Sequence, residues 1–587
     1  MTLRMLAWTW KTWPDSIVDF GKELYVAWRI AAGQHLYLDL AHYSGPLSSY
    51  LNGTWFRWAG TSLHSLLALN FVWWVLLFWL LRRTLSKMAG PLAVGCAMSF
   101  FILIFSFGQY VGIGNYNYLA PYAHELTHGL LLSLGALVLA GRWMESGRVR
   151  DAGWAGVCLG LSFLTKPEVS LPGFAAVGAG VLARIWMKRR GERSDVAGML
   201  FLALCAAGVV LAALALLSLR MPWSVAMEGI LMPWRNLWLA PLVQLPFFRN
   251  LSGLDHPAAN AGMMLVAALA YAAVFAVAYG AGRFLRKRTA VAVTLGVCAT
   301  ALFVAWHLPA QDIARPLPFF LAMGLGWSIW KIWRRRGEGD GGGERLRWMF
   351  GVFSFTLLLK ILLNVRIWHY GFVLGMPAAL YLIVASMDWI PRRFASHPDR
   401  GLAWRIATVG VLGIVAGLCW GQMSVVLSRK KFEAGSGRDS FRADASGHFI
   451  NQFMHGVNRI VPAGATLAVL PEGAMLNYLL RLENPTPYAN LMPPEMLVFG
   501  EERIVEAFRA NPPDYIVLVN KDTTEFGARF FGQDYGRSLA RWIKDHYEGV
   551  FLVGQAPFVD PHSFGLLLLR RSAPGLDPQT TAGPIRR

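Results

Sequence analysis

Long apolar runs alternate with short polar connections between residues 62 and 427. A helical run of about 17–22 apolar residues crosses a hydrocarbon core roughly 30 Å thick. The pattern predicts twelve such helices: 62–81, 91–108, 126–141, 152–165, 170–187, 197–218, 260–281, 289–307, 316–331, 348–364, 370–387 and 404–427. We therefore predict a polytopic α-helical membrane protein whose multi-span core covers residues 62–427.

The pattern changes after residue 427, where the apolar runs shorten and strand and helix periodicities alternate. The predicted strands are 466–470 and 514–520, and the predicted amphipathic helices are 501–510 and 538–547. Two closing strands are predicted at 549–554 and 564–570. Residues 428–570 are therefore expected to form a small α/β domain. The stretch 571–587 is rich in Pro, Gly and Thr and is expected to be a disordered tail.

The connections between the predicted spans alternate in charge. Every second connection is basic, and these six hold 25 Lys and Arg, whereas the intervening loops hold six. Because Lys and Arg are retained in cytoplasmic loops, the other set of loops faces the extracytoplasmic side. These outer loops are 109–125, 166–169, 219–259, 308–315 and 365–369. The same alternation puts residues 14–61 and the C-terminal domain outside the cytoplasm.

An extracytoplasmic segment at 14–61 needs a preceding span. Residues 1–13 are too short to cross a membrane at about 1.5 Å per residue. The apolar stretch MLAWTW is therefore expected to be the end of a truncated first helix, so that region 1–61 combines this helix with the first outer loop and the total is twelve to thirteen spans. A cleaved signal peptide is the alternative, although a small-residue cleavage site is missing.

Composition supports the membrane assignment. Hydrophobic residues make up 55% of the chain, charged residues only 15%, and the mean hydropathy is +0.41, which is typical of membrane proteins. The formal net charge of +20 is explained by the cytoplasmic loops, so a nucleic-acid partner is not expected. The five cysteines lie in apolar runs without a CxxC pair, so we expect buried thiols rather than a disulfide framework.

The first outer loop concentrates acids and histidines. They are Asp15, Asp19, Glu23, Asp39, His35 and His42. Asp19 and Glu23 are four residues apart and would share one face of a helix. Carboxyl and imidazole groups that collect on a loop supported by many spans indicate a site for proton chemistry. The alternative is an ordinary solvated or interfacial loop.

The second outer loop is rich in tyrosine and has no Lys or Arg. Side chains that could line a polar cavity are Asn115, Asn117, Tyr118, Tyr122, His124, Glu125 and His128. For the tyrosines, an interfacial aromatic belt is the alternative. Residues 124–128 read HELTH, whose two histidines share a helical face and could bind a divalent metal ion with Glu125 as general base. Because no third ligand is evident nearby, a metal-free polar cluster is favoured.

Cations occur where the outer charge rule disfavours them. Lys166 and Glu168 lie at the end of one predicted span, and Lys360 lies inside another. A charge within a span is costly and indicates function. Arg366, His369 and Tyr370 follow at the outer end. Arg binds phosphate through two parallel hydrogen bonds and Lys binds it as a point charge. Lys166, Lys360 and Arg366 could therefore hold a lipid phosphate. For Lys166, a partner such as Glu168 or a lipid headgroup is the alternative.

The sequence 19–47, DFGKELYVAWRIAAGQHLYLDLAHYSGPL, resembles the first outer loop of a glycosyltransferase superfamily. An acid follows the first helix, and then come a helix and a "G…LY.D…GPL" segment. This arrangement is similar to that of the C-type (GT-C) polyprenyl-phosphate-sugar-dependent glycosyltransferases, which include protein O-mannosyltransferases and aminoarabinose transferases. Asp19 fits the position of the family's catalytic acid. The adjacent Asp-Glu pair of the family is absent here, since Phe20 follows and Glu23 lies one turn later.

The resemblance implies transfer of a sugar from a polyprenyl-phosphate donor to a hydroxyl of a glycan, lipid or protein, at the outer face of a bacterial inner (plasma) membrane. Asp19 would be the general base, with Glu23, Asp39 or Glu125 positioning the acceptor or tuning the base. Lys166 and Arg366 would stabilise the leaving phosphate. The remaining candidate substrate-binding residues are His42, Tyr118, Tyr122, His124, Glu168, His369 and Tyr370. No cofactor is assigned with certainty, and a divalent metal ion is the one candidate.

Three other functions remain open at this stage. A transporter or flippase would need polar residues deep in several spans and often internal repeats, and few deep charges beyond Lys360 are found. A membrane metalloprotease would rest on the HELTH run alone. A non-catalytic assembly or sensor protein would use the C-terminal domain as a receptor, with the loops 471–473 and 492–495 as ligand sites. The collection of acids and histidines at one surface favours surface chemistry.

Overall fold

The computed structural model describes residues 1–113, 116–187, 196–307, 310–334, 342–369, 371–394 and 397–572. Each of the twelve apolar runs forms a helix. Their bounds are α4 (Leu63–Ser86), α5 (Pro91–Phe100) continued by the π-helical η1 (Phe101–Ser106), α6 (His124–Ser146), α7 (Val149–Phe163), α8 (Pro167–Met187), α9 (Val196–Ser218), α13 (Pro257–Phe284), α14 (Lys287–Trp306), α15 (Leu317–Arg334), α16 (Gly342–Leu358), α17 (Met376–Val384) and α19 (Pro398–Arg429). The prediction of a polytopic helical protein is confirmed.

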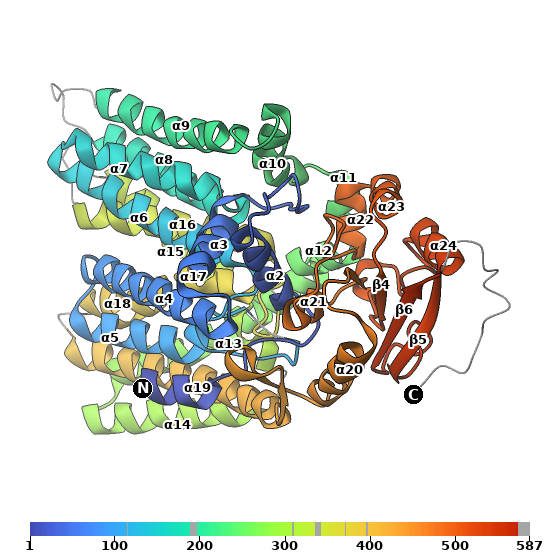
Figure 1. Ribbon diagram of the computed structural model, residues 1–587. Helices are drawn as coiled ribbons and strands as arrows, with labels where there is room; N and C mark the ends of the chain where they lie inside the picture. The colour runs from blue at the N-terminus through green and yellow to red at the C-terminus, as the bar shows by residue number, and fades with distance from the viewer. Residues whose placement is uncertain are drawn as a thin grey trace.

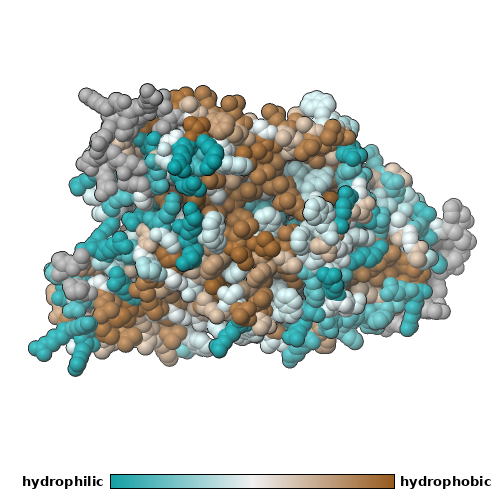
Figure 2. All heavy atoms as spheres, turned by 60° about the vertical axis from the view of Figure 1, so that its left-hand side comes forward, coloured by the Kyte–Doolittle hydropathy of each residue, from teal (hydrophilic) through white to brown (hydrophobic). Residues whose placement is uncertain are grey.

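Within the described residues, eight helical segments are long and apolar enough to cross a membrane. The other four predicted spans are shorter or end in charge: α5 with η1, α7, α15 and α16. The segment Phe372–Arg392, which contains α17, is largely buried, as is α6, whereas α9, α13 and α14 are mostly exposed. Apolar residues spread over the face seen in Figure 2, as expected for a surface in contact with lipid. Exposed examples are Trp79, Leu182, Leu204, Leu265 and Phe303.

A layer of short helices covers one end of the bundle, between the membrane helices and the C-terminal domain (Figure 1). It contains α2 (Phe20–Ala31), α3 (Leu47–Ala59), α10 (Trp223–Asn236), α11 (Ala240–Val243), α12 (Pro246–Ser252) and the turns η2 (Ala310–Ala314), η3 (Leu359–Ile361) and η4 (Phe372–Gly375). At the opposite end, η5 (Ala385–Trp389) and α18 (Ile390–Arg392) continue α17. The N-terminal α1 (Thr2–Thr9) lies beside α19, where Trp8 and Trp420 have ring centroids 5.3 Å apart.

The predicted elements of the C-terminal domain are all present. Four strands form one sheet in the order β3 (Leu467–Leu470), β4 (Tyr515–Val519), β6 (Gly565–Arg571) and β5 (Tyr547–Gly554). The β3–β4 pair is parallel and the other two pairs are antiparallel. The two predicted helices are α23 (Glu501–Ala510) and α24 (Arg537–His546). The structure adds a small hairpin of β1 (Phe432–Ala434) and β2 (Phe441–Ala443), and three helices, α20 (Ser446–Ile460), α21 (Ala474–Leu480) and α22 (Pro493–Phe499). Residues 573–587 of the predicted tail lie outside the described residues.

The first outer loop packs directly on the C-terminal domain. Ile17 belongs to the hydrophobic cluster on one face of the sheet. A side chain at Gly21 of α2 would overlap the backbone of Met475 on α21. The amide of Asn484 donates to the Tyr25 hydroxyl at 3.0 Å, and the amide of Ala41 donates to the carbonyl of Pro487 at 2.9 Å. These contacts fix the loop between the bundle and the sheet.

Candidate functional site

The turn before α2 holds Asp19 in a rare backbone conformation. The Asp15 carboxylate accepts hydrogen bonds from the amides of Ile17 at 2.9 Å and Val18 at 2.8 Å. This turn brings Asp19 to the start of α2 with φ at +54°. Non-glycine residues adopt such angles at a cost of about 1–3 kcal/mol, and they cluster at functional sites. The surrounding contacts must therefore hold Asp19 in place.

Those contacts come from the C-terminal domain. The amide of Asp19 donates to the Glu472 carboxylate at 3.0 Å, and the other Glu472 oxygen lies 3.2 Å from Lys521 Nζ. Glu472 is buried and lies in the turn between β3 and α21. Lys22 on α2 and Glu495 on α22 also interact electrostatically with Asp19. We call Asp19, Lys22, Glu472, Glu495 and Lys521 the acid centre.

Burial raises the pKa of two carboxyl groups in the acid centre, Asp19 and Glu495. Burial, together with the neighbouring Glu472 carboxylate, raises the pKa of Asp19 to about 7, although Lys521 and Lys22 oppose the shift. Burial also raises the pKa of Glu495. For Lys521, burial is outweighed by Glu472 and Asp15, which raise the pKa of its ammonium group. A carboxyl group with a pKa close to the working pH is well matched to general base catalysis.

Two histidine–carboxylate pairs join the first outer loop to α6. His124 Nδ1 lies 2.7 Å from the Glu23 carboxylate, and His124 Nε2 lies 3.0 Å from the side-chain oxygen of Asn70 on α4. His42 Nε2 lies 3.2 Å from the Glu125 carboxylate. We call Glu23, His42, His124 and Glu125 the histidine bridge. These four side chains, proposed from the sequence, do come together.

Tyr43 connects the histidine bridge to the acid centre. Its ring stacks on His42 with centroids 6.2 Å apart, and Lys22 Nζ lies 4.1 Å from the centroid of the same ring. Its hydroxyl donates to the Glu495 carboxylate. The two groups are therefore parts of one polar region at the end of the bundle that faces the C-terminal domain. Tyr43 was not singled out from the sequence.

A third group of charges lies around the start of α8 and just beyond the end of α16. Lys360 Nζ donates to Glu168 at 2.5 Å. Arg366 Nε and Arg315 Nε lie 3.3 Å and 2.6 Å from the same Asp312 oxygen. Lys166 interacts electrostatically with both Glu168 and Glu125 of the histidine bridge. The paired-charge cluster consists of Lys166, Glu168, Asp312, Arg315, Lys360 and Arg366.

Lys360 corrects one sequence-based boundary. The predicted span 348–364 ends as an α-helix at Leu358, and Lys360 lies in the 3-10 turn η3 rather than within a span. Its ammonium group reaches Glu168 at the start of α8, which explains how the charge is accommodated. His369 follows in the loop and faces Arg366, Lys360 and Arg315. Burial, together with these cations, lowers the pKa of His369 to about 4.

Three of the remaining predicted residues make contacts within the protein. The Asp39 carboxylate accepts a hydrogen bond from the amide of His35 at 2.7 Å and so closes a tight turn. The hydroxyl of Tyr118 donates to the carbonyl of Val373 at 3.0 Å. Tyr122 is buried, with its ring 5.5 Å from that of Tyr116. The positions proposed for Asn115 and Tyr370 lie outside the described residues.

The HELTH run serves to connect helices. Both ring nitrogens of His124 are engaged by Glu23 and Asn70, and His128 Nδ1 lies 2.9 Å from the Ser48 hydroxyl. Glu125 is directed to His42. In the described ranges, no group of three or more His, Cys, Asp or Glu is arranged to hold a metal ion.

Glu472 and Lys521 of the acid centre were not singled out as candidate site residues from the sequence, although a signal for them exists. The turn 471–473 was considered only as a ligand loop of a receptor domain. Leu470 of β3 pairs with Leu518 of β4 in a parallel register. Glu472 and Lys521 each follow the end of one of these strands, so both lie at the carboxyl edge of a parallel pair. Ligand sites of α/β domains favour that edge.

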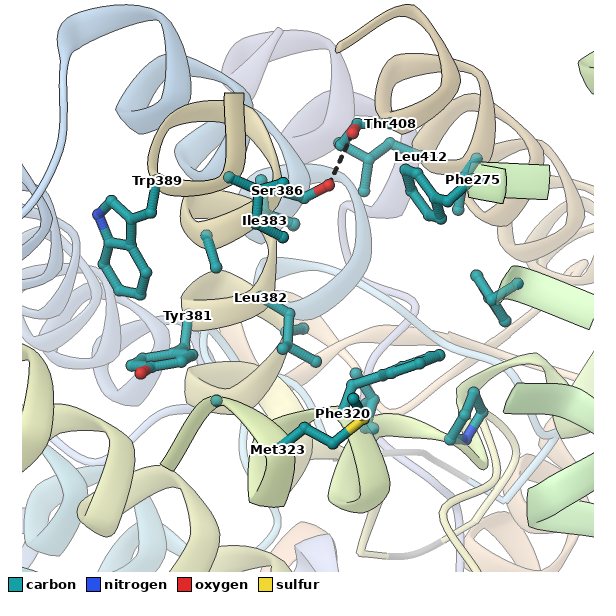
Figure 3. Close-up of a pocket in the computed structure, with 18 of the residues that line it drawn as sticks. Phe275, Phe320, Met323, Tyr381, Leu382, Ile383, Ser386, Trp389, Thr408 and Leu412 are labelled. Atoms are coloured by element: carbon teal, nitrogen blue, oxygen red, sulfur yellow. Dashed lines mark hydrogen bonds between the residues drawn. The ribbon is translucent and has the colours of Figure 1, made fainter. Parts of the chain in front are cut away.

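A cavity of about 960 Å³ runs between α13, α15, α17 and α19. Figure 3 shows Phe320 and Met323 on one side of the cavity and Phe275 and Leu412 on another. The Ser386 and Thr408 hydroxyls form a hydrogen bond of 2.7 Å. Its outer end is lined by Ile313, Pro316 and Ile367, which are chain neighbours of Asp312, Arg315 and Arg366. Its opposite end is lined by Lys331, Arg347 and Arg393.

No family model and no curated protein matches the chain. Among solved structures, the archaeal oligosaccharyltransferase AglB from Archaeoglobus fulgidus, in complex with an inhibitory peptide and a dolichol-phosphate, matches over 96% of this chain and 73% of its own, with a TM-score of 0.42 and 12% identity. ArnT from Cupriavidus metallidurans in the apo state matches over 97% and 96%, with a TM-score of 0.42 and 13% identity. A likeness of this degree carries no argument about chemistry.

Proposed function

We propose that this chain is a membrane glycosyltransferase that moves a sugar from a polyprenyl-phosphate donor to an acceptor hydroxyl at the outer membrane face. One observation carries the proposal. The acid centre and the paired-charge cluster occupy the same outer end of the bundle, and the histidine bridge joins them through Tyr43 and Lys166. A base for the acceptor and cations for a phosphate are thus available in one polar region.

The acid centre would act on the acceptor. The Asp19 carboxylate takes the proton of the acceptor hydroxyl as the acceptor oxygen forms a bond to the anomeric carbon. The bond from that carbon to the phosphate oxygen breaks, and its electron pair leaves with the polyprenyl phosphate. The pKa of Asp19, raised to about 7 by burial and by Glu472, makes it a stronger base than an ordinary aspartate. The Asp39 carboxylate is already engaged by the amide of His35. Glu23 and Glu125 are therefore the better candidates for positioning the acceptor.

The paired-charge cluster would hold the leaving phosphate. It contains four cations, Lys166, Lys360, Arg315 and Arg366, against two carboxylates, Glu168 and Asp312. The excess positive charge favours an anion, and negative charge grows on the phosphate oxygen as the glycosyl bond breaks. The apolar cavity offers a route for the isoprenoid chain, because its outer end adjoins Asp312, Arg315 and Arg366.

The test is turnover by purified protein in lipid vesicles that contain a panel of polyprenyl-phosphate-linked sugars and a mixture of acceptors. Lipid mass spectrometry follows the loss of donor and the appearance of polyprenyl phosphate. Asp19→Asn is expected to lower turnover by roughly 100-fold or more, with polyprenyl phosphate binding retained. Asp545→Asn, at an exposed position on α24, is the matched control and should turn over normally. Wild-type turnover in Asp19→Asn would refute the role of Asp19.

A further inference from the structure

We propose that Glu472 and Lys521, both contributed by the C-terminal domain, act on Asp19 as positioning residues with opposite effects on its proton occupancy. The domain would therefore complete the acid centre rather than simply cover it. The inference rests on the proposed function only for the role of Asp19 as base. The contacts that carry it do not depend on which sugar is transferred.

The fold brings the two residues together from neighbouring strands. β3 and β4 are parallel, and Glu472 and Lys521 follow their carboxyl ends. The ion pair between them measures 3.2 Å. Lys521 also faces the carboxylates of Asp15 and Glu525, which hold its positive charge in place. The pair therefore lies at the sheet edge, and the first outer loop adds the Asp15 carboxylate to its surroundings.

Asp19 is fixed against this pair by shape and by a hydrogen bond. Its amide donates to Glu472 at 3.0 Å, although its backbone is in a strained conformation. Gly21, two residues later, packs against the backbone of Met475 without room for a side chain. The Glu472 carboxylate that accepts this hydrogen bond is also close enough to the Asp19 carboxyl group for their negative charges to repel each other. Glu472 thus holds Asp19 in position and opposes its negative charge at the same time.

The charged groups that interact with Asp19 come from α2, from α22 and from the turns that follow β3 and β4. Glu472 and Glu495 are carboxyl groups from the C-terminal domain and disfavour a second negative charge. Lys521 from the same domain and Lys22 from α2 favour it. Removal of Glu472 should therefore lower the pH at which Asp19 loses its proton, and removal of Lys521 should raise it. A residue that served packing alone would not give shifts of opposite sign.

The experiment measures the proton on Asp19 without a substrate. Dicyclohexylcarbodiimide adds to protonated carboxyl groups in apolar surroundings and leaves a stable N-acylurea. The full-length protein in detergent is labelled over a range of pH, and the modified peptide is quantified by mass spectrometry. Tryptic cleavage after Lys11 and Lys22 gives a peptide with both Asp15 and Asp19, so fragment ions assign the adduct. Asp19→Asn should remove the Asp19 adduct.

The wild-type labelling midpoint for Asp19 is expected near pH 7. Glu472→Gln should move it down and Lys521→Met should move it up, each by about one pH unit. The double variant E472Q/K521M removes both charges and should return the midpoint toward the wild-type value. It also serves as a check on misfolding, because damage to the fold would not cancel. Asp545→Asn should leave the midpoint unchanged.

Equal midpoints in all variants, or shifts of the same sign in both single variants, would overturn the inference. A failure of the proposed function gives a different result. In that case Asp19→Asn would turn over normally while the opposite shifts in labelling remained. If instead Asp19→Asn lost turnover and the midpoints did not move, Asp19 would be the base and the C-terminal domain would not influence it.

Discussion

The acid centre and the paired-charge cluster are both polar groups at the end of the helix bundle that faces the C-terminal domain, but their charges are balanced in opposite ways. The acid centre has three carboxyl groups and two lysines. The paired-charge cluster has two carboxylates and four cations. Excess carboxyl groups in a buried region retain a proton, whereas excess cations attract an anion. One group is therefore suited to proton transfer and the other to holding a phosphate.

The two groups also differ in how the chain assembles them. The paired-charge cluster lies on the ends of membrane helices and the turns between them, which the bundle fixes directly. The acid centre combines a turn of the first outer loop with two turns of the C-terminal domain, and a hydrogen bond joins positions 453 residues apart. Its geometry therefore depends on docking between these regions. Perturbation of the docking should damage the acid centre and spare the paired-charge cluster.

The largest expected effect is that of Gly21→Ala. The added methyl group would overlap the backbone of Met475, which cannot move aside as a flexible side chain can. Overpacking typically costs about 1–3 kcal/mol, and here the strain falls between α2 and α21. Turnover should fall by roughly 100-fold, whereas binding of polyprenyl phosphate in nanodiscs should persist.

Gly95→Ala is the matched control, because a methyl group at that helical position meets no other atom within 4 Å. Hydrogen exchange of α21 should increase in Gly21→Ala and not in Gly95→Ala. Loss of phosphate-lipid binding in Gly21→Ala would mean that the two groups are not assembled independently.

The second prediction concerns a substitution in the paired-charge cluster. Arg366→Ala removes a guanidinium group while Arg315 keeps Asp312 paired at 2.6 Å, so the fold should be preserved. Binding of polyprenyl phosphate should weaken by roughly 10- to 100-fold, as expected for the loss of a charge-assisted contact. Arg366→Lys should fall in between, since Lys keeps the charge without the planar fork. The carbodiimide midpoint of Asp19 should not change; a shift would show that the two groups interact electrostatically.

Sequence reasoning identified the membrane helices because the bilayer imposes one length and one polarity on every span. It also singled out Asp19, Glu23, His42, His124 and Glu125 as candidates, because they lie in two unusually polar segments of the chain. The structure places Asp19 in the acid centre and the other four in the histidine bridge. It could not find the role of Glu472 and Lys521 beside Asp19, because their significance arises only when the sheet docks on the first outer loop. The span around Lys360 was extended too far for a similar reason. The apolar run continues beyond Leu358, but the helix ends where Lys360 reaches Glu168, 192 residues earlier in the chain.

The third prediction concerns pH. The pKa of Asp19 is raised in the folded protein above its ordinary value by burial and by Glu472. The proton on Asp19 therefore contributes stability that is complete below about pH 4 and is lost as the pH rises through about 7. Above about pH 7 the folded protein must hold a buried negative charge on Asp19, which costs stability, and Asp19→Asn removes that cost. Its Tm should exceed that of the wild type at about pH 8 and approach it at about pH 4, measured by thermal unfolding in detergent. A Tm difference independent of pH would contradict the raised pKa.

The smallest expected effect is that of Glu483→Gln at the edge of the same docking surface. Glu483 pairs with Arg29 of α2 at 2.5 Å, but its side chain is 52% exposed, whereas that of Arg29 is 6% exposed. Exposed ion pairs contribute about 0–1 kcal/mol, and Arg29 keeps its hydrogen bond to Gln34 at 3.1 Å. The glutamine can still accept from the guanidinium group. Turnover and Tm should therefore stay close to wild type, in contrast to Gly21→Ala on α2, the helix that carries Arg29. A loss comparable to that of Gly21→Ala would mean that charge, rather than the fit of α2 against α21, holds the acid centre together.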